Sequence, residues 1–183
     1  MAPSIGRLMS RRVLGVALAF RQALPRKAMR SPLLALALMV VFAGTVLATG
    51  AINFHSTILS RGTLSEPVHF NTGAVKFQTK GSVDFVTVTV TIDAPGSSGW
   101  HAHPGVVLVT VASGSVVQYD EHCSATTHTA LSASSSFVES GDDPGVVRNE
   151  STSIPAIVYV TYIVPTGTTA LRINKDNPGC PQN

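Results

Sequence analysis

The segment that most constrains the fold of this chain is "VDFVTVTVTI" (83–92), in which threonine alternates with valine or isoleucine. Successive side chains of a strand point to opposite faces, so this pattern predicts a strand with one buried face. "VVLVTVA" (106–112) and "AIVYVTYIV" (156–164) are also rich in branched apolar residues. Turn signals such as "APGSSG", "DDPG" and "PTGT" separate these runs. The pattern predicts an all-β sandwich or barrel.

The N-terminal part of the chain differs in composition from the rest. Seven of the thirteen Lys and Arg residues lie in segment 1–30, and segment 31–52 is almost entirely apolar. An apolar run of about twenty residues is typical of a secretory signal peptide or a membrane-spanning helix. The basic residues before it favour export of the part of the chain on its C-terminal side. The sequence therefore predicts an N-terminal hydrophobic helix, with translation starting at Met1 or at Met29.

These shifts predict four parts: a basic segment (1–30), a signal peptide or transmembrane anchor (31–52), a linker (53–60) and a β-barrel domain (61–180). The domain is then extracytoplasmic, either secreted or anchored to the cell membrane by residues 31–52. The chain from residue 51 onward has six basic and ten acidic residues, which gives a net charge of −4. Nucleic acid is not an expected partner, because such a domain lacks the basic surface that binds phosphates.

The chain has two cysteines, Cys123 and Cys180. In an exported domain, an even number of cysteines favours a disulfide. Such a bond would tie the end of the chain to a loop in the middle of the barrel. Two free thiols are the alternative.

The stretch "GWHAHPGVVLVTVASG" (99–114) contains the main candidate ligands, His101 and His103. Side chains at positions i and i+2 of a strand share a face, so these two imidazoles can point to one metal ion. Two imidazoles alone bind a divalent ion weakly, since durable sites have three or four protein ligands.

From about Arg61 to Cys180, the chain resembles a small, single-domain, exported bacterial cupin. The first cupin motif reads roughly G-x5-H-x-H-x3,4-E-x6-G, and His101, His103 and Gly114 match it. Val107 stands at the glutamate position. Of the second motif only Asn149 remains, and Gly145 stands where a histidine is expected.

The resemblance implies an antiparallel, jelly-roll-like cupin barrel that binds one divalent metal ion (Zn, Mn, Fe or Cu) in its interior. It leaves three interpretations open. In the first, substitute ligands complete the metal site. The candidates are His69, His122, His128, Glu139, Asp142 and Asp143.

In the second interpretation the metal site is lost, and Trp100, His101 and His103 line a pocket for a small organic ligand. In the third, the barrel is a non-catalytic structural or interaction module with a vestigial metal site.

We expect an exported or membrane-anchored cupin-domain protein that binds a metal ion or a small ligand inside the barrel. If the chain is an enzyme, the resemblance implies metal-dependent dioxygenase or isomerase chemistry. The expected partners are a small-molecule ligand, the membrane through the N-terminal segment and, as an alternative to a monomer, a second copy in a homodimer.

Overall fold

The structure is a computed structural model that describes residues 50–181. The predicted basic segment (1–30), and the signal peptide or anchor helix apart from its last three residues, lie outside the described residues. The regular elements of residues 50–181 are all β-strands, as the alternating pattern predicts. In this part of the chain, no helix is long and apolar enough to span a membrane.

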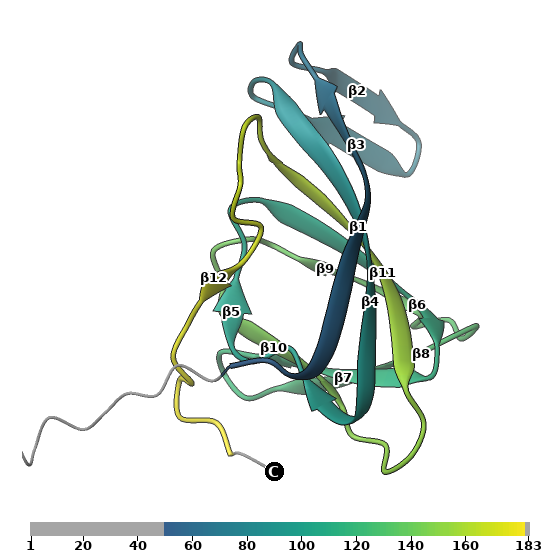
Figure 1. Ribbon diagram of the computed structural model, residues 1–183. Coiled ribbons are helices and arrows are strands. Elements are labelled where there is room, and N and C mark those ends of the chain that lie inside the picture. The colour runs from purple at the N-terminus through teal and green to yellow at the C-terminus, as the bar shows by residue number, and fades with distance from the viewer. Residues whose placement is uncertain (1–49, 182–183) are drawn as a thin grey trace, which may run out of the picture. The chain divides into compact units, whose positions relative to one another are not determined.

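The strands between residues 50 and 181 follow one another along the chain (Figure 1). They are β1 (Ile52–Leu64), β2 (His69–Thr72), β3 (Val75–Gln78), β4 (Val83–Ser97), β5 (His101–Ala102), β6 (Val106–Ser113), β7 (Ser115–Asp120), β8 (Ala125–Thr129), β9 (Ser136–Glu139), β10 (Gly145–Asn149), β11 (Ala156–Pro165) and β12 (Ile173–Asn174).

Ten of these strands form one antiparallel sheet that curls into a nearly closed barrel (Figure 1). One half contains β1, β4, β11, β6 and β9 in that order, and the other contains β12, β5, β10, β7 and β8. The halves join where β10 pairs with the end of β4, with Arg148 opposite Ser97. β2 and β3 form a separate hairpin in the connection between β1 and β4. The expected jelly-roll-like antiparallel barrel is confirmed.

The alternating segment forms most of β4, the strand that both halves share. Its side chains Val86, Val88, Val90 and Ile92 are buried in the core, whereas the threonines between them are only half-buried. The inward side chains of β6 and β11 pack against them. Burial of branched apolar side chains on one face therefore holds this half of the barrel together.

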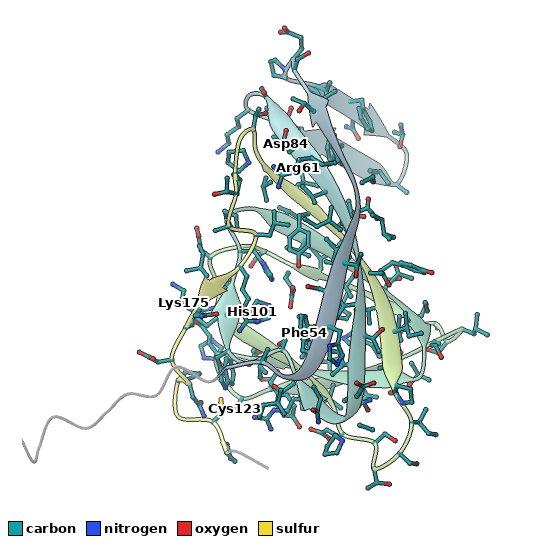
Figure 2. The ribbon with its side chains drawn as sticks, viewed as in Figure 1. Phe54, Arg61, Asp84, His101, Cys123 and Lys175 are labelled. Atoms are coloured by element: carbon teal, nitrogen blue, oxygen red, sulfur yellow. A yellow bond between two sulfur atoms is a disulfide. The ribbon has the colours of Figure 1, made fainter. Side chains whose placement is uncertain are left out.

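The segment 53–60, expected to be a linker, is instead part of β1. This strand pairs with β4 along nearly its whole length, so the barrel begins at Ile52 and not at residue 61. Most side chains of β1 are exposed, and Phe54 is the one that packs against the core (Figure 2). This strand is defined by backbone pairing with β4. Because few of its side chains are buried, its sequence shows no alternation of apolar and polar residues.

Gly114 alone separates β6 from β7 and carries the chain from one half of the barrel to the other. Its φ angle is +73°, a conformation that glycine adopts without steric cost. A Cβ atom at this position would lie 2.6 Å from the carbonyl oxygen of Pro155. The crossing between the halves therefore requires glycine at position 114.

Asp84 lies on the inward side of β4, near the end of the barrel that adjoins β2 and β3 (Figure 2). Its carboxylate accepts hydrogen bonds from the Thr63 hydroxyl at 2.8 Å, the Arg61 guanidinium at 3.0 Å and the Gly167 amide at 3.2 Å. The bond from Thr63 is the main cause that lowers the pKa of Asp84, against the opposing effect of burial. These bonds connect β1 and the loop after β11 to β4.

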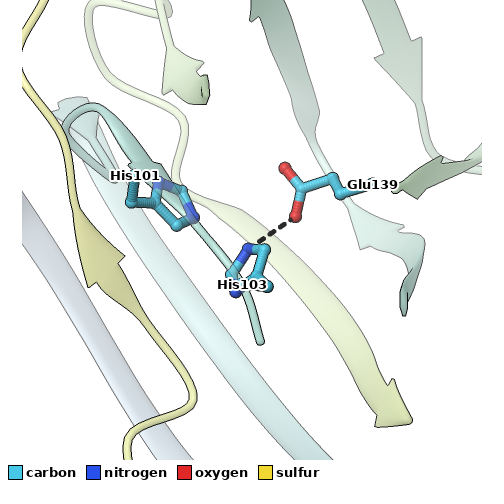
Figure 3. A group of neighbouring side chains, drawn as sticks. All are labelled: His101, His103 and Glu139. Atoms are coloured by element: carbon cyan, nitrogen blue, oxygen red, sulfur yellow. Dashed lines mark hydrogen bonds and ion pairs between the residues drawn. The ribbon is translucent and has the colours of Figure 1, made fainter. Parts of the chain in front are cut away.

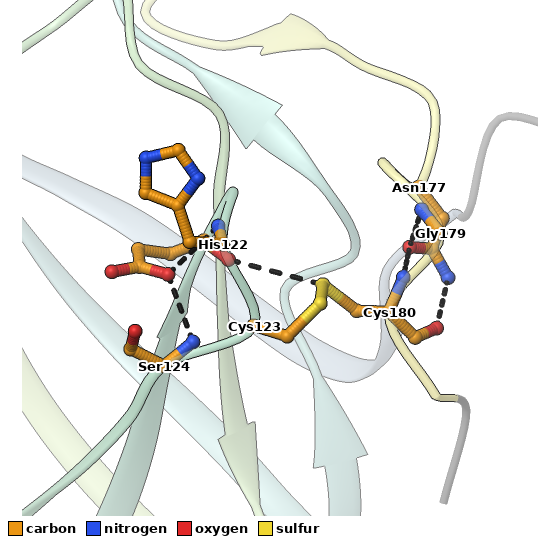
Figure 4. The surroundings of a disulfide bond; sticks show 7 residues. His122, Cys123, Ser124, Asn177, Gly179 and Cys180 are labelled. Carbon is orange, nitrogen blue, oxygen red and sulfur yellow. Dashed lines mark hydrogen bonds between the residues drawn. A yellow bond between two sulfur atoms is a disulfide. The ribbon is translucent and has the colours of Figure 1, made fainter.

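Cys123 and Cys180 form a disulfide, as the cysteine count favours (Figure 4). Cys123 lies in the loop between β7 and β8, and Cys180 is buried beyond β12. Within the tail, the side-chain oxygen of Asn177 accepts hydrogen bonds from the amides of Gly179 at 3.0 Å and Cys180 at 2.7 Å, which form a local turn before the disulfide. The end of the chain is thus fastened to the second half of the barrel.

We predict that Cys123→Ser/Cys180→Ser lowers the free energy of unfolding by about 4 kcal/mol, because the bond closes a long loop in the unfolded chain. The two cysteines are 57 residues apart in the sequence. Guanidinium chloride denaturation of both proteins under non-reducing conditions measures the difference. Wild-type protein in dithiothreitol is the control and is expected to match the variant. A loss below about 1 kcal/mol would contradict the prediction.

Candidate metal centre

His101 lies in β5 and His103 directly follows Ala102, the last residue of that strand. The side chains share a face, as their spacing predicts, and their exposed fractions are only 7 % and 3 %. The imidazole rings contact edge to face, with centroids 4.7 Å apart. The structure therefore brings both predicted ligands into the barrel interior.

Backbone carbonyls fix the orientation of both rings. Nδ1 of His101 is 2.8 Å from the carbonyl oxygen of Gly99, and Nδ1 of His103 is 2.7 Å from that of Leu171. A carbonyl oxygen only accepts hydrogen bonds, so each Nδ1 carries a hydrogen. In the neutral rings, Nε2 is then left with a free lone pair. Histidines that bind metals commonly have this arrangement.

Glu139 in β9 supplies a carboxylate to the same point (Figure 3). β9 pairs with β6 in a register that sets Glu139 directly opposite Val107, the position at which the cupin motif expects glutamate. Directly opposite residues of an antiparallel pair place their side chains on the same face. The carboxylate that Val107 lacks therefore comes from the neighbouring strand. Of the substitute ligands considered, Glu139 is the one that joins His101 and His103.

His103 and Glu139 contact each other directly, at the distance of a hydrogen bond or ion pair. Nε2 of His103 is 3.0 Å from Oε2 of Glu139. A lone pair and a carboxylate oxygen repel each other at this distance unless a proton or a cation lies between the two groups. One ligand atom from each of His101, His103 and Glu139 lies within 4.8 Å of the others. These three residues could hold one divalent ion.

The position that the second motif assigns to histidine supplies no ligand. Gly145 lies in β10 in register with His101. Val147, two residues further along β10, lines the interior, so a side chain at position 145 would face the same side. With glycine there, an ion held by His101, His103 and Glu139 would have three protein ligands, and this chain would leave a further coordination position open. Catalytic zinc and non-haem iron sites also use three protein ligands and an open position.

The surroundings of His101 keep its ring neutral. Burial lowers the pKa of His101 to about 4, and the charges of Arg172 and His103 act in the same direction. The carboxylate of Glu139 acts in the opposite direction. A neutral imidazole is the form that binds a metal ion, so His101 needs no proton loss near pH 7 before it can coordinate.

The three ligands open onto a cavity of about 40 Å³ in the barrel interior. Most of its lining is apolar, from β4, β6, β10 and β11, and Phe54 closes one side. Tyr162 in β11 adds a polar group, and its ring contacts His103 with centroids 5.3 Å apart. Burial, followed by the charge of Glu139, raises the pKa of Tyr162 to about 12. This hydroxyl therefore stays protonated.

Arg172 lies beside this interior, in the segment between β11 and β12. Its Nη1 donates a hydrogen bond to the carbonyl oxygen of Ser98, and its Nε donates to Oδ1 of Asn174 at 2.8 Å. Burial lowers the pKa of Arg172, while Tyr162 and Glu139 act in the opposite direction. The guanidinium charge is therefore close enough to act on the site.

The other candidate ligands lie elsewhere. His69, His122, Asp142 and Asp143 are exposed. His128 is buried, and its ring stacks on Phe137 with centroids 4.3 Å apart. Its Nδ1 donates to the carbonyl oxygen of Ser134 at 2.9 Å. Within residues 50–181, the only group of three or more potential ligands is His101, His103 and Glu139.

Trp100, expected to share a pocket with the histidines, does not line their cavity. It precedes His101, so its side chain points to the opposite face, where it packs with Val146 and Cys180. There it lines a larger, open pocket of about 730 Å³. The alternation of side chains thus separates Trp100 from the metal ligands.

The sequence interpretation did not identify Tyr162, Leu171 or Arg172. A signal was available for Tyr162, which is the only aromatic residue among the inward-facing positions of β11. Leu171 acts through its carbonyl oxygen, which no side-chain pattern can reveal. The position of Arg172 depends on the path of the segment after β11, for which the sequence offers no regular pattern.

We predict that His101 of the metal-free protein stays neutral until the pH falls to about 4. The unfolded state protonates this residue near pH 6.5, so acid favours unfolding between these two values. His101→Gln is expected to reduce the loss of stability between pH 6.5 and pH 4 by up to about 3 kcal/mol. Urea denaturation across this range, with the His101 ring followed by NMR, measures both effects. Titration of His101 above pH 6 would contradict the prediction.

No family model and no curated protein matches the chain. Among solved structures, it is similar to the polyketide cyclase RemF from Streptomyces resistomycificus, with 11 % identity, a TM-score of 0.47, and coverage of 72 % of this chain and 79 % of that one. It is also similar to a cupin domain from Bordetella pertussis Tohama I, with 16 % identity, a TM-score of 0.39, and coverage of 64 % and 96 %.

A third similar structure is an uncharacterised conserved protein with a double-stranded β-helix domain from Klebsiella pneumoniae. Its identity is 20 %, its TM-score is 0.39, and the match covers 59 % of this chain and 80 % of that one. Activity and residue roles are not transferred at this level of similarity. The described residues form an antiparallel barrel with the histidine pair of β5 facing the interior, the arrangement that the sequence resemblance to cupins predicts.

Proposed function

We propose that this cupin-fold protein binds one divalent metal ion through His101, His103 and Glu139. The observation that carries the proposal is the convergence of the imidazoles of His101 and His103 and the carboxylate of Glu139 on one buried point. Imidazole and carboxylate together suit zinc, manganese, iron and copper. The ion would take the place of the proton between Nε2 of His103 and Oε2 of Glu139.

The cavity favours an ion over an organic ligand. Pockets for organic ligands usually have volumes of about 300–1,000 Å³. The space beside the histidines is about 40 Å³, enough for roughly three water molecules. An ion with its remaining coordination filled by small molecules fits this space.

The open coordination position makes a metal-dependent activity part of the proposal. A divalent ion with a free position would act there as a Lewis acid, or would bind a small reactant. The chain's own residues hold the ion, orient the two imidazoles through the carbonyls of Gly99 and Leu171, and exclude bulk water with an apolar lining. Dioxygenase-like or isomerase-like chemistry is compatible with this arrangement.

We further propose that the barrel works outside the cytoplasm. The disulfide between Cys123 and Cys180 supports this location, because such bonds persist in oxidising compartments. The apolar segment 31–52 would deliver the domain there, as a cleaved signal peptide or as an anchor.

Metal analysis tests the proposal. The full chain, purified without chelator or histidine tag and supplied with Zn²⁺, Mn²⁺, Fe²⁺ or Cu²⁺, is expected to hold about one ion per chain. His101→Ala/His103→Ala removes two of three ligands, and Glu139→Gln removes the charged one. We expect the affinity to fall by roughly 100-fold or more in both variants.

His122→Ala is the matched control, because His122 is an exposed histidine outside the site. This variant is expected to keep its ion. A folded wild-type protein that takes up none of the four ions would overturn the metal proposal and leave the structural module as the better interpretation.

A further inference from the structure

The charges around the candidate ion are not balanced. A divalent ion contributes two positive charges and Glu139 one negative charge. Arg172, half-buried beside the site, adds a further positive charge. The imidazoles of His101 and His103 are neutral when they coordinate. The loaded interior therefore carries a net positive charge, and burial of such a charge without a counter-ion is costly.

Tyr162 offers a hydrogen-bond donor beside the open position. In the strand register, Val107 of β6 lies directly opposite Glu139 of β9 on one side and opposite Tyr162 of β11 on the other. Glu139 and Tyr162 thus flank Val107 on the same inward face. Glu139 and Tyr162 both line the cavity.

The Tyr162 hydroxyl makes no hydrogen bond to any residue between 50 and 181. Its ring lies against His103, which fixes the side chain beside the ligands. A half-buried hydroxyl usually has a partner, because an unpaired polar group in an apolar environment costs free energy. Because Tyr162 lines the cavity, a ligand bound there could accept a hydrogen bond from its hydroxyl.

The size of the cavity limits the acceptor. A space of about 40 Å³ suits a ligand of two or three heavy atoms. The acceptor atom of such a ligand must reach the Tyr162 hydroxyl. The charge of the ligand must offset the positive charges of the ion and Arg172.

We propose that the metal centre takes a small monoanion of two or three heavy atoms, which fills the open coordination position and accepts a hydrogen bond from Tyr162. This inference rests on the proposed metal binding by His101, His103 and Glu139. It assigns the class of the ligand, and it assigns to Tyr162 the role of a specificity-determining residue.

Azide and formate are the probes. The full chain is loaded with Co²⁺, whose visible spectrum reports on its coordination, and is titrated with each anion. We expect both anions to bind the wild-type protein and to change the spectrum. Tyr162→Phe keeps the ring but removes the hydroxyl. We expect the affinity for both anions to fall roughly 10- to 100-fold, as for loss of a hydrogen bond to a charged group. The affinity for Co²⁺ itself is expected to be unchanged.

Tyr159→Phe is the matched control, since Tyr159 lies in the same strand with its side chain exposed. Formamide, a neutral molecule of the size of formate, tests the charge and is expected to bind more weakly than formate. A second variant, Arg172→Gln, is expected to lower the affinity for both anions and to leave the affinity for formamide unchanged.

The outcomes separate the two proposals. A folded chain that takes up neither Co²⁺ nor any of Zn²⁺, Mn²⁺, Fe²⁺ and Cu²⁺ overturns both the metal proposal and this inference. Uptake of Co²⁺ with equal anion affinity in wild type and Tyr162→Phe overturns the role of Tyr162 alone. Formamide that binds as tightly as formate overturns the assignment of an anion.

Discussion

The antiparallel register of β9, β6 and β11 is the constraint on which the candidate site depends. It places Glu139, Val107 and Tyr162 in one row across three strands, with all three side chains on the inward face. A shift of any strand by one residue would turn its side chain away from the interior. The apolar faces of β6 and β11, packed against β4, fix this register. The polar site is therefore held in place by the surrounding core.

The candidate site also depends on contact between the two halves of the barrel. β5, which carries His101, belongs to one half, and β9, which carries Glu139, belongs to the other. The imidazoles and the carboxylate converge only because β10 joins the end of β4 and Gly114 returns the chain to the second half. In the proposed site, the two histidines are thus close in the sequence, whereas Glu139 reaches them only through the closed fold.

Much of this architecture could be predicted from the sequence, and the reasons are local. Alternation in 83–92 identifies β4, because one of its faces is buried. The spacing of His101 and His103 places them on one face. β1 could not be predicted, since its side chains are mostly exposed and its pairing with β4 is its main determinant. Glu139 could be named only among several candidates, because its place opposite Val107 is set by a long-range register.

The link between the tail and His103 has a consequence for the order in which the protein matures. Leu171, whose carbonyl oxygen orients His103, lies nine residues before Cys180, which the disulfide fastens to the loop after β7. In a reducing cytoplasm this segment has no covalent attachment, and the His103 ring has a less rigid support. For an exported chain, the ligand geometry would thus be completed after oxidation. Under the proposed function, the ion would then be drawn from the supply outside the cytoplasm, and the metals available there would decide which ion the proposed site takes.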